Sequence, residues 1–265
     1  MRRGDENAGP AFRLNAWLGF ERGHCVDSSI DNRLVEITSG PSPATIADVL
    51  AMMRGIDDLL PSGDGLKWFN RLYMMVTEQV DMTPPAGGWK DSAWLAHLDV
   101  VFARFYFAAI LNWFNSPASV PRSWQALMEA RFRPGVERIQ FALAGMNAHI
   151  NHDLSLALLA TDTEMNLAPA KTSPQHADFE SVNGLLEAVL PRALNLLAAG
   201  ILGELAQDTG KIGKLLAIWD VRAARDMAWD FADHLRTLSE LARNTALTAQ
   251  DQMTGALGRS LLLTI

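Results

Sequence analysis

The most apolar part of the chain is Ile139-Gln140-Phe141-Ala142-Leu143-Ala144-Gly145-Met146-Asn147-Ala148-His149-Ile150-Asn151-His152-Asp153-Leu154-Ser155-Leu156-Ala157-Leu158-Leu159-Ala160. It is apolar on nearly every face of a helix, a pattern typical of a helix buried at the centre of a fold. Its middle nevertheless carries five polar residues: Asn147, His149, Asn151, His152 and Asp153. A buried polar group without a partner costs about 1–3 kcal/mol, so this cluster calls for partners or a function.

The rest of the chain also has the three-and-four spacing of apolar residues that predicts helices. The predicted helices span about residues 41–60, 66–80, 91–114, 124–130, 134–160, 178–206, 211–244 and 249–263. Alternating runs rich in Val, Ile and Thr, which would predict strands, are nearly absent. The sequence therefore predicts an all-α, single-domain helical bundle around a buried central apolar helix. It covers residues 41–265, and residues 1–40, rich in Gly, Asn, Asp and Ser, are predicted to be a partly irregular arm or cap.

Composition excludes several classes of protein. With 23 basic and 30 acidic residues the formal charge is −7, and no basic stripe is present, so we expect no nucleic-acid partner. The one cysteine, Cys25, rules out an internal disulfide framework and favours a reducing compartment. No long apolar run follows Met1, so we expect no secretory signal, and no uninterrupted apolar run reaches the roughly 18 residues of a membrane span. We therefore expect a cytoplasmic protein without a membrane partner.

The two faces of the central segment differ in chemistry. Helical geometry puts His149 and Asp153 on one face, flanked by His152, and places Asn147 and Asn151 on the opposite face. Small residues such as Gly145 lie one turn from His149 and would leave room for a ligand or for a closely packed helix. The Asn face is more typical of amides that bridge helices.

Three hypotheses suit His149 and Asp153. In the first, the carboxylate orients the imidazole, which moves protons near neutral pH. In the second, His149, His152 and Asp153 bind one divalent metal ion, with further ligands from His97, Asp99 or Asp178. In the third, the two residues only hydrogen-bond to neighbouring helices. The absence of GxGxxG, P-loop, GxSxG and HExxH patterns argues against common nucleotide-dependent, serine-hydrolase and zincin chemistries.

The segment Gly145–Asn151, followed by Asp153-Leu154, resembles the signature of a bacterial helical family known as domain of unknown function 5995. Weaker matches follow in order and span about residues 45–240: Phe69–Tyr73 with Val76–Glu78, Leu98–Ala103 with Tyr106, Asp178-Phe179 with Val182-Asn183, and Ala224-Arg225 with Ala228-Trp229. The resemblance implies a helical fold, a polar centre drawn from several helices, and no established reaction. The family has an apolar residue at the position of His152, which weakens the metal hypothesis, and an arginine at the position of Phe105.

These observations lead to one leading hypothesis. We expect an enzyme without a cofactor that acts by acid–base chemistry on a small, mostly apolar molecule, by cyclisation, isomerisation, dehydration or hydrolysis. The predicted catalytic residues are His149 as proton shuttle, Asp153 as its orienting group, and Asp99, Tyr106 and Arg225 as supporting groups. The predicted binding residues are Asn147, Asn151, Tyr73, Glu78, Asp178, Asn183 and Trp229. The alternatives are a metal-dependent hydrolase and a non-catalytic module that binds an apolar ligand or a protein; the oligomeric state stays open.

Overall fold

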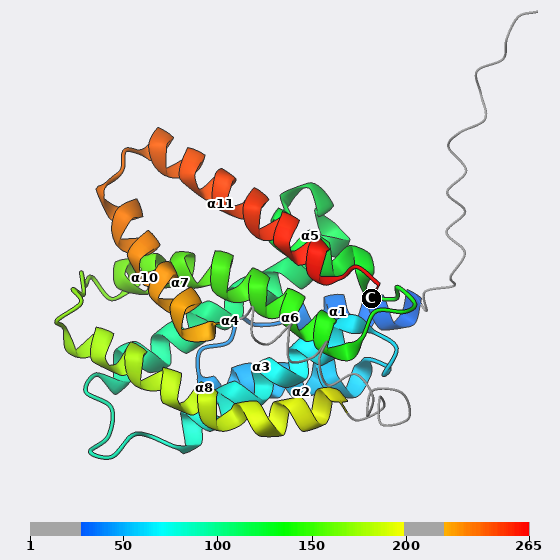
Figure 1. Ribbon diagram of the computed structural model, residues 1–265, viewed down its shortest axis with the longest axis horizontal. Coiled ribbons are helices and arrows are strands. Elements are labelled where there is room, and N and C mark those ends of the chain that lie inside the picture. The colour runs from blue at the N-terminus through cyan, green and yellow to red at the C-terminus, as the bar shows by residue number, and fades with distance from the viewer. Residues whose placement is uncertain (1–27, 199–219, 265) are drawn as a thin grey trace, which may run out of the picture.

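The computed structural model describes residues 28–198 and 220–264 of the chain (Figure 1). Its helices are α1 (Ser28–Thr38), α2 (Ile46–Leu59), α3 (Gly65–Met82), α4 (Ser92–Asn115), η1 (Pro117–Ser119), α5 (Arg122–Ala130), α6 (Arg138–Ala148), η2 (His149–Asp153), α7 (Leu154–Glu164), α8 (Pro174–Ala198), α10 (Val221–Thr237) and α11 (Glu240–Leu261). These two ranges contain no strand. The predicted all-α class is therefore confirmed.

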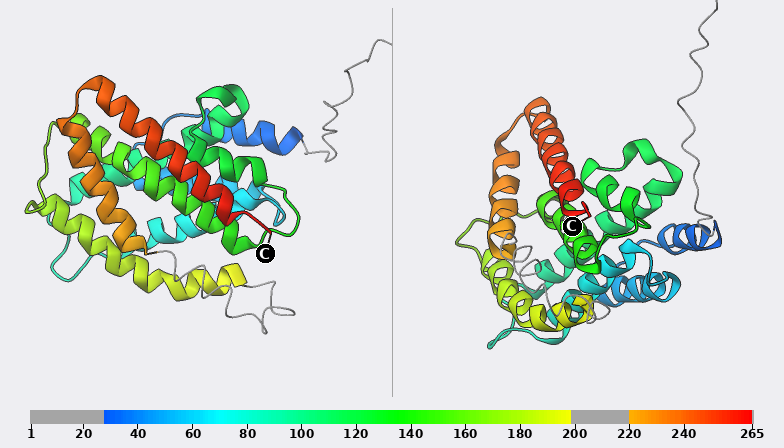
Figure 2. Two further views of the ribbon diagram at one scale, coloured as in Figure 1. Left: turned by 45° about the horizontal axis from the view of Figure 1, so that its top comes forward. Right: turned by 45° about the vertical axis from the view of Figure 1, so that its right-hand side comes forward.

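The segments α6, η2 and α7 follow one another without a break in helical backbone, because His149 and Asp153 at the joints both have right-handed helical angles. Every residue from Ile139 to Ala148 is buried. Helices α3, α5, α8 and α11 contact α6, while α4 and α10 contact α7 and η2. The continuous helix formed by α6, η2 and α7, residues 138–164, is called the central rod below. Figure 2 shows α11 crossing the bundle on one side of the central rod and α8 on the other. The most apolar stretch of the sequence thus lies against most of the other helices.

Local sequence signals fix several helix ends. Thr45 caps α2: its side chain accepts a hydrogen bond from the Asp48 backbone, and Asp48 accepts one from the backbone of Thr45. Asp64 caps α3 by accepting a bond from the Leu66 N–H, and its carboxylate also pairs with the buried Arg131 guanidinium at 2.5 Å. Since Arg131 follows α5 and also pairs with Asp31 of α1, this buried ion pair ties three helices together.

The structure corrects two predicted helix boundaries and adds a helix within the predicted arm. Residues 28–38 of that arm form α1, whose Leu34 is fully buried and which packs on α2 and α4. The central helix begins at Arg138 and not at Pro134. The predicted helix over 211–244 is interrupted, because Ser239 has an extended backbone and caps the new helix α11. Cys25, residues 199–206 and residues 211–219 lie outside the described ranges.

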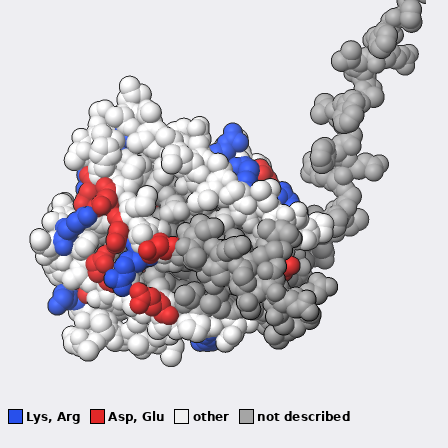
Figure 3. All heavy atoms as spheres, viewed as in Figure 1, with Lys and Arg blue, Asp and Glu red and all other residues white. Residues whose placement is uncertain are grey.

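One helix, α4, is long and apolar enough to cross a membrane by length and composition alone. Of its most apolar window, 56% is buried inside the structure, as in the core helix of a soluble protein, so this observation is weak evidence for a span. On the surface, acidic and basic side chains lie intermixed over α10 (Figure 3). Exposed ion pairs there include Lys171 with Asp230 and Arg222 with Glu187.

Candidate functional site

The site is built on η2, one turn of π-helix in the middle of the central rod. The N–H of Leu154 donates to the carbonyl of His149, five residues earlier, where an α-helix would use the fourth. Single π-turns inside α-helices are rare and occur frequently at functional sites. Here the π-turn contains both His149 and Asp153.

The His149–Asp153 pair is buried and has a fixed orientation. Nδ1 of His149 lies 3.1 Å from Oδ2 of Asp153, and the indole N–H of Trp124 donates to the same oxygen at 2.9 Å. His149 and Asp153 are each 1% exposed. Nε2 of His149 is enclosed and has no hydrogen-bond partner among residues 28–198 and 220–264. A buried nitrogen without a partner costs free energy, so its presence is informative.

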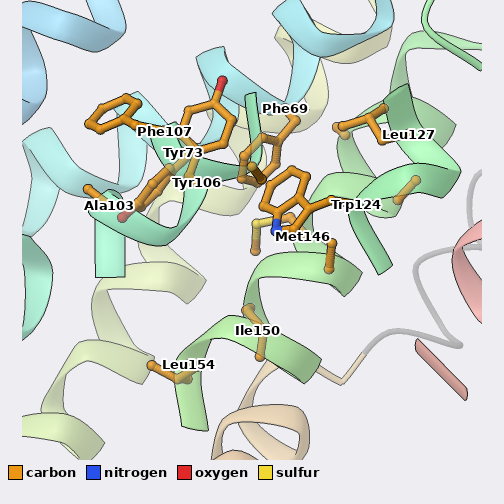
Figure 4. Packing of buried hydrophobic residues seen from close by; sticks show 14 of the residues in the cluster. Phe69, Tyr73, Ala103, Tyr106, Phe107, Trp124, Leu127, Met146, Ile150 and Leu154 are labelled. Carbon is orange, nitrogen blue, oxygen red and sulfur yellow. The ribbon is translucent and has the colours of Figure 1, made fainter. Parts of the chain in front are cut away.

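Aromatic rings surround the imidazole. The Phe102 ring stacks on it, with centroids 3.5 Å apart and planes 6° apart, and the Tyr73 ring lies edge-on at 4.3 Å. The rings of Phe69, Trp124 and Tyr106 follow at 5.7, 6.1 and 6.4 Å. Figure 4 shows Phe69, Tyr73, Tyr106 and Trp124 gathered next to Met146 of the central rod. The imidazole is therefore enclosed by apolar surface.

The small residue Gly145 does not leave empty space beside the imidazole. A Cβ built on Gly145 would come within 2.3 Å of the Phe69 ring. Gly145 therefore allows α3 to approach the central rod closely enough for Phe69 to reach His149. Of the two expectations for this face, room for a ligand and room for a neighbouring helix, the second holds at Gly145.

Burial controls the protonation of the pair. Desolvation lowers the pKa of His149 well below its usual value, and the charge of nearby His152 acts in the same direction. Desolvation also raises the pKa of Asp153 well above its usual value, although the hydrogen bond from Trp124 acts against this. Burial therefore disfavours the charged form of both residues. Because the two groups interact strongly, they titrate as one unit.

Further buried polar groups lie on α4 and α10. Asp99 lies one turn of α4 before Phe102, whose ring stacks on His149. Desolvation raises the pKa of Asp99 to about 7, despite the opposing charge of Arg225. Arg225 of α10 donates from Nε to Asn183 at 2.8 Å and from Nη2 to the Phe179 carbonyl at 2.6 Å, and burial lowers its pKa to about 10. The predicted residues Arg225 and Asn183 are therefore hydrogen-bonded to each other.

Tyr106 supports the site without offering its hydroxyl to it. That hydroxyl donates to Oδ1 of Asn70 at 3.1 Å, while the amide of Asn70 donates to the Met53 carbonyl. Burial raises the pKa of Tyr106 well above its usual value, so the hydroxyl stays protonated. Tyr106 therefore contributes its ring to the aromatic shell and connects α4 to α3.

The Asn face of the central rod contacts α11. Asn147 donates to the Thr254 carbonyl at 2.8 Å, and Asn151 donates to Asn147 at 3.0 Å. Gln140, on the same face, donates to the carbonyls of Leu261 and Leu263. This arrangement matches the helix-bridging interpretation, and it places Asn147 and Asn151 away from His149.

Three further predicted residues have other partners. Asp178 accepts the backbone N–H groups of Lys90 and Asp91 at 2.8 and 2.6 Å, which fixes the loop before α4. Glu78 pairs with Arg54 of α2. Trp229 packs against the ring of Trp94, 6.1 Å away, and its indole N–H has no partner in the described ranges.

His152 faces a different helix from His149. Its Nε2 lies 3.5 Å from Oδ1 of Asp251 on α11, and Asp251 in turn accepts the backbone N–H groups of Arg122 and Ser123 at the start of α5. Within residues 28–198 and 220–264, no three His, Cys, Asp or Glu side chains are grouped so that they could hold a metal ion. His149, His152 and Asp153 therefore do not converge on one point.

Sequence reasoning missed the residues that shape the pair most directly. Trp124, Phe102 and Phe69 come from α5, α4 and α3, and none lies within 20 residues of His149 in the chain. Phe69 and Phe102 stand within blocks that resemble the family, but no local pattern connects them to His149. For Trp124 the available signal was chemical: a buried indole N–H needs an acceptor, and Asp153 is one of few buried carboxylates.

Fold and site together define the protein as an all-α bundle with a buried His–Asp pair on an interrupted central helix. The chain belongs to the family of unknown function DUF5995, whose pattern matches residues 46–264. No curated protein and no solved structure matched in the other two comparisons. The family assignment confirms the resemblance seen in the sequence and brings no reaction with it.

Proposed function

We propose that the protein is an enzyme that acts on a small, mostly apolar molecule by acid–base chemistry at His149 and Asp153. One observation carries the proposal: Nε2 of His149 is enclosed and unpartnered in the described ranges, while Nδ1 is held by Asp153. A structural histidine normally has both ring nitrogens bonded. A nitrogen left free, on a ring held in a fixed orientation, is what proton transfer to a substrate requires.

The proton balance of the pair suits both directions of transfer. In the proposed resting form both residues are neutral, with the Asp153 hydroxyl donating to Nδ1 and a proton on Nε2. Nε2 gives this proton to a substrate, and Nδ1 then takes the proton of Asp153, which leaves a carboxylate. The N–H of Trp124 donates to this carboxylate oxygen and stabilises its charge. In that second form Nε2 is a base, and it recovers a proton from the product. The imidazole thus starts and ends neutral within one turnover.

The surroundings favour an apolar substrate. Most groups near the imidazole are aromatic rings, which bind apolar surface and interact favourably with a cation formed on protonation. The Phe102 ring covers one face of the imidazole and is itself partly exposed. In the proposed mechanism, rotation of the Phe102 ring opens that face of the imidazole to a ligand. Cyclisation, isomerisation, dehydration and hydrolysis all fit this chemistry.

The proposal is tested by a readout that does not require knowledge of the substrate. The purified protein is incubated in D₂O with an apolar extract from bacterial cells, and deuterium incorporation and new products are measured by mass spectrometry. Acid–base turnover introduces solvent deuterium into the substrate or converts it. We expect deuterium incorporation, a new product or both from the wild-type protein, and neither from the His149→Asn variant.

The matched control is His97→Asn. His97 forms a second His–carboxylate pair, with Nε2 at 2.8 Å from Glu164, but that pair is partly exposed and belongs to the surface. His97→Asn should keep the activity. Activity that persists in His149→Asn, or a wild-type protein that changes no compound in the extract, would contradict the proposal. The second result, together with a loss of stability in His149→Asn, would favour a non-catalytic module.

Elemental analysis of protein purified without a metal-affinity step decides the metal hypothesis separately. About one zinc, manganese or iron per chain that is lost in His149→Asn would replace acid–base chemistry with metal-dependent hydrolysis. The proposal takes the ligand to be a small lipophilic molecule and the compartment to be the cytoplasm.

A further inference from the structure

Helix α5 is capped by a residue that belongs to another helix. The residue before α5 is Pro121, whose side chain has no atom that accepts a hydrogen bond. The first two backbone N–H groups of α5, those of Arg122 and Ser123, donate to Oδ2 and Oδ1 of Asp251 at 2.8 and 2.9 Å. Asp251 lies on α11, 129 residues after Arg122. A carboxylate at a helix N-terminus satisfies such donors and interacts favourably with the helix dipole.

The part of α11 that carries Asp251 packs closely against α5 and the central rod. A Cβ built on Gly255, one turn after Asp251, would come within 2.7 Å of the Arg122 carbonyl oxygen, so a side chain there would push the two helices apart. Asn147 of the central rod donates to the Thr254 carbonyl at 2.8 Å. Figure 1 shows this end of α11 beside α5. Asp251 therefore reaches the start of α5 from a fixed position.

The turn of α5 that Asp251 caps also carries Trp124, which follows Ser123 directly. The indole N–H of Trp124 donates to Oδ2 of Asp153 at 2.9 Å, and the same oxygen lies 3.1 Å from Nδ1 of His149. Helix ends fray from the first turn, and a cap that satisfies the first N–H groups opposes this fraying. The cap on α5 thus acts on the turn that places the indole against the proposed site.

The contacts around this turn close into a ring. His152 precedes Asp153 on η2, and Nε2 of His152 lies 3.5 Å from Oδ1 of Asp251. The ring leads from Asp251 to the backbone of Ser123, along α5 to Trp124, across to Asp153, and back through His152 to Asp251. All of its members except Asp251 are buried, so water does not readily replace one that is displaced.

We propose that Asp251 is a positioning residue of the proposed reaction: by capping α5, it keeps the indole N–H of Trp124 on the carboxyl group of Asp153. The inference rests on the proposed function only in assigning a reaction to the His149–Asp153 pair. Asp251 acts through the backbone of α5 and through the indole, and it is not itself a catalytic group.

Hydrogen exchange of two indole N–H groups tests this inference in the full-length protein without a substrate. The NMR signal of the Trp124 indole is assigned by its loss in Trp124→Phe. The internal reference is Trp94, which is similarly buried and donates to Asp162 at 3.0 Å. Global unfolding exposes both indoles, so the ratio of the Trp124 exchange rate to the Trp94 rate reports local opening. We expect Asp251→Ala to raise this ratio at least about tenfold, and Asp251→Asn, which keeps one acceptor oxygen, to raise it less.

The matched control is Asp178→Ala. Asp178 also accepts two backbone N–H groups from a distant segment, those of Lys90 and Asp91, but these groups precede α4. Its loss should not raise the ratio. His152→Gln removes the other neighbour of Asp251 and should leave the ratio unchanged, because the cap on α5 remains.

Two results would overturn the inference: an unchanged ratio in Asp251→Ala, or an equal rise in Asp178→Ala or His152→Gln. If Asp251→Ala does not fold, Asp251→Asn decides, and it should raise the ratio by at least about twofold.

Turnover separates the inference from the proposed function. Asp251→Ala should slow the deuterium or product signal by a factor similar to that of Trp124→Phe. Adding Asp251→Ala to Trp124→Phe should then slow it no further, because both changes act on the same bond; a further loss would overturn the inference. A raised exchange ratio in a protein without turnover would disprove the proposed function and still show that Asp251 holds Trp124 in place. An unchanged ratio in a protein with turnover would disprove only the inference.

Discussion

Replacing Trp124 by Phe removes one hydrogen bond from the buried pair and leaves the ring packing largely intact. The indole N–H donates to Oδ2 of Asp153 at 2.9 Å, and both side chains are 1% exposed, so no water replaces the bond at once. Loss of a buried donor costs about 1–3 kcal/mol. The smaller ring also leaves a cavity of a few carbon atoms, at about 1 kcal/mol or more. We therefore expect destabilisation of about 2–4 kcal/mol.

The chain contains a matched control. Trp94 is also fully buried, and its indole N–H donates to Oδ1 of Asp162 at 3.0 Å. Trp94→Phe should therefore cost a similar free energy, measured for both variants by urea denaturation. Only Trp124→Phe should alter catalysis, because only Trp124 stabilises the carboxylate that forms when His149 gives up its proton. Its loss raises the pKa of Asp153 further, and the alkaline limb of the pH–rate profile should move to higher pH.

Two results would refute this reasoning. A Trp124→Phe variant destabilised by less than about 0.5 kcal/mol would mean that the hydrogen bond contributes little. Equal pH–rate profiles in wild type and Trp124→Phe would mean that Asp153 does not change protonation during turnover. Either result can be recognised separately from a general loss of stability, because Trp94→Phe reports that loss alone.

Three further predictions concern stability, each measured by urea denaturation. Gly145→Ala should destabilise by about 1–3 kcal/mol, because its Cβ would meet the Phe69 ring at 2.3 Å; an unchanged midpoint would contradict the close approach. Asp251→Ala should cost about 1–2 kcal/mol, because Asp251 accepts two backbone N–H groups at the start of α5; a neutral effect would show that water replaces it. The free energy of unfolding of Asp99→Asn, relative to that of wild type, should be higher at pH 8 than at pH 4. The folded pKa of Asp99, about 7, is above the ordinary 3.8, so stability is lost as the pH rises between these values; an equal difference at both pH values would exclude this burial effect.

The helical class and the buried central segment could be predicted from sequence because both depend on local periodicity. Apolar residues on all faces of 139–160 indicate burial whatever the neighbours are, and the structure buries every residue from Ile139 to Ala148. The same periodicity placed Asn147 and Asn151 on the face opposite His149, and Asn147 bonds to α11. His149 and Asp153 were paired by their spacing of four, which a helix brings together without help from the rest of the chain.

Other features came only from the tertiary structure. The π-turn closes its hydrogen bond over one residue more than the α-helical periodicity of the sequence predicts, and α4, α10 and α11 pack against it. The break between α10 and α11 follows from Ser239 taking an extended backbone where the apolar pattern continues. Tyr106 was expected at the reacting centre, but its hydroxyl is used by Asn70, 36 residues earlier in the chain.

The sequence by itself therefore determined which residues are helical, which helix is buried, and that His149 would meet Asp153. The tertiary structure decided that Trp124 bonds to Asp153, that Phe102 covers the imidazole, and that Nε2 is left free. The physical reason is the range of the interactions. Helix periodicity and pairs four apart are set within one or two turns, whereas the partners of a buried polar atom depend on which helices pack against it.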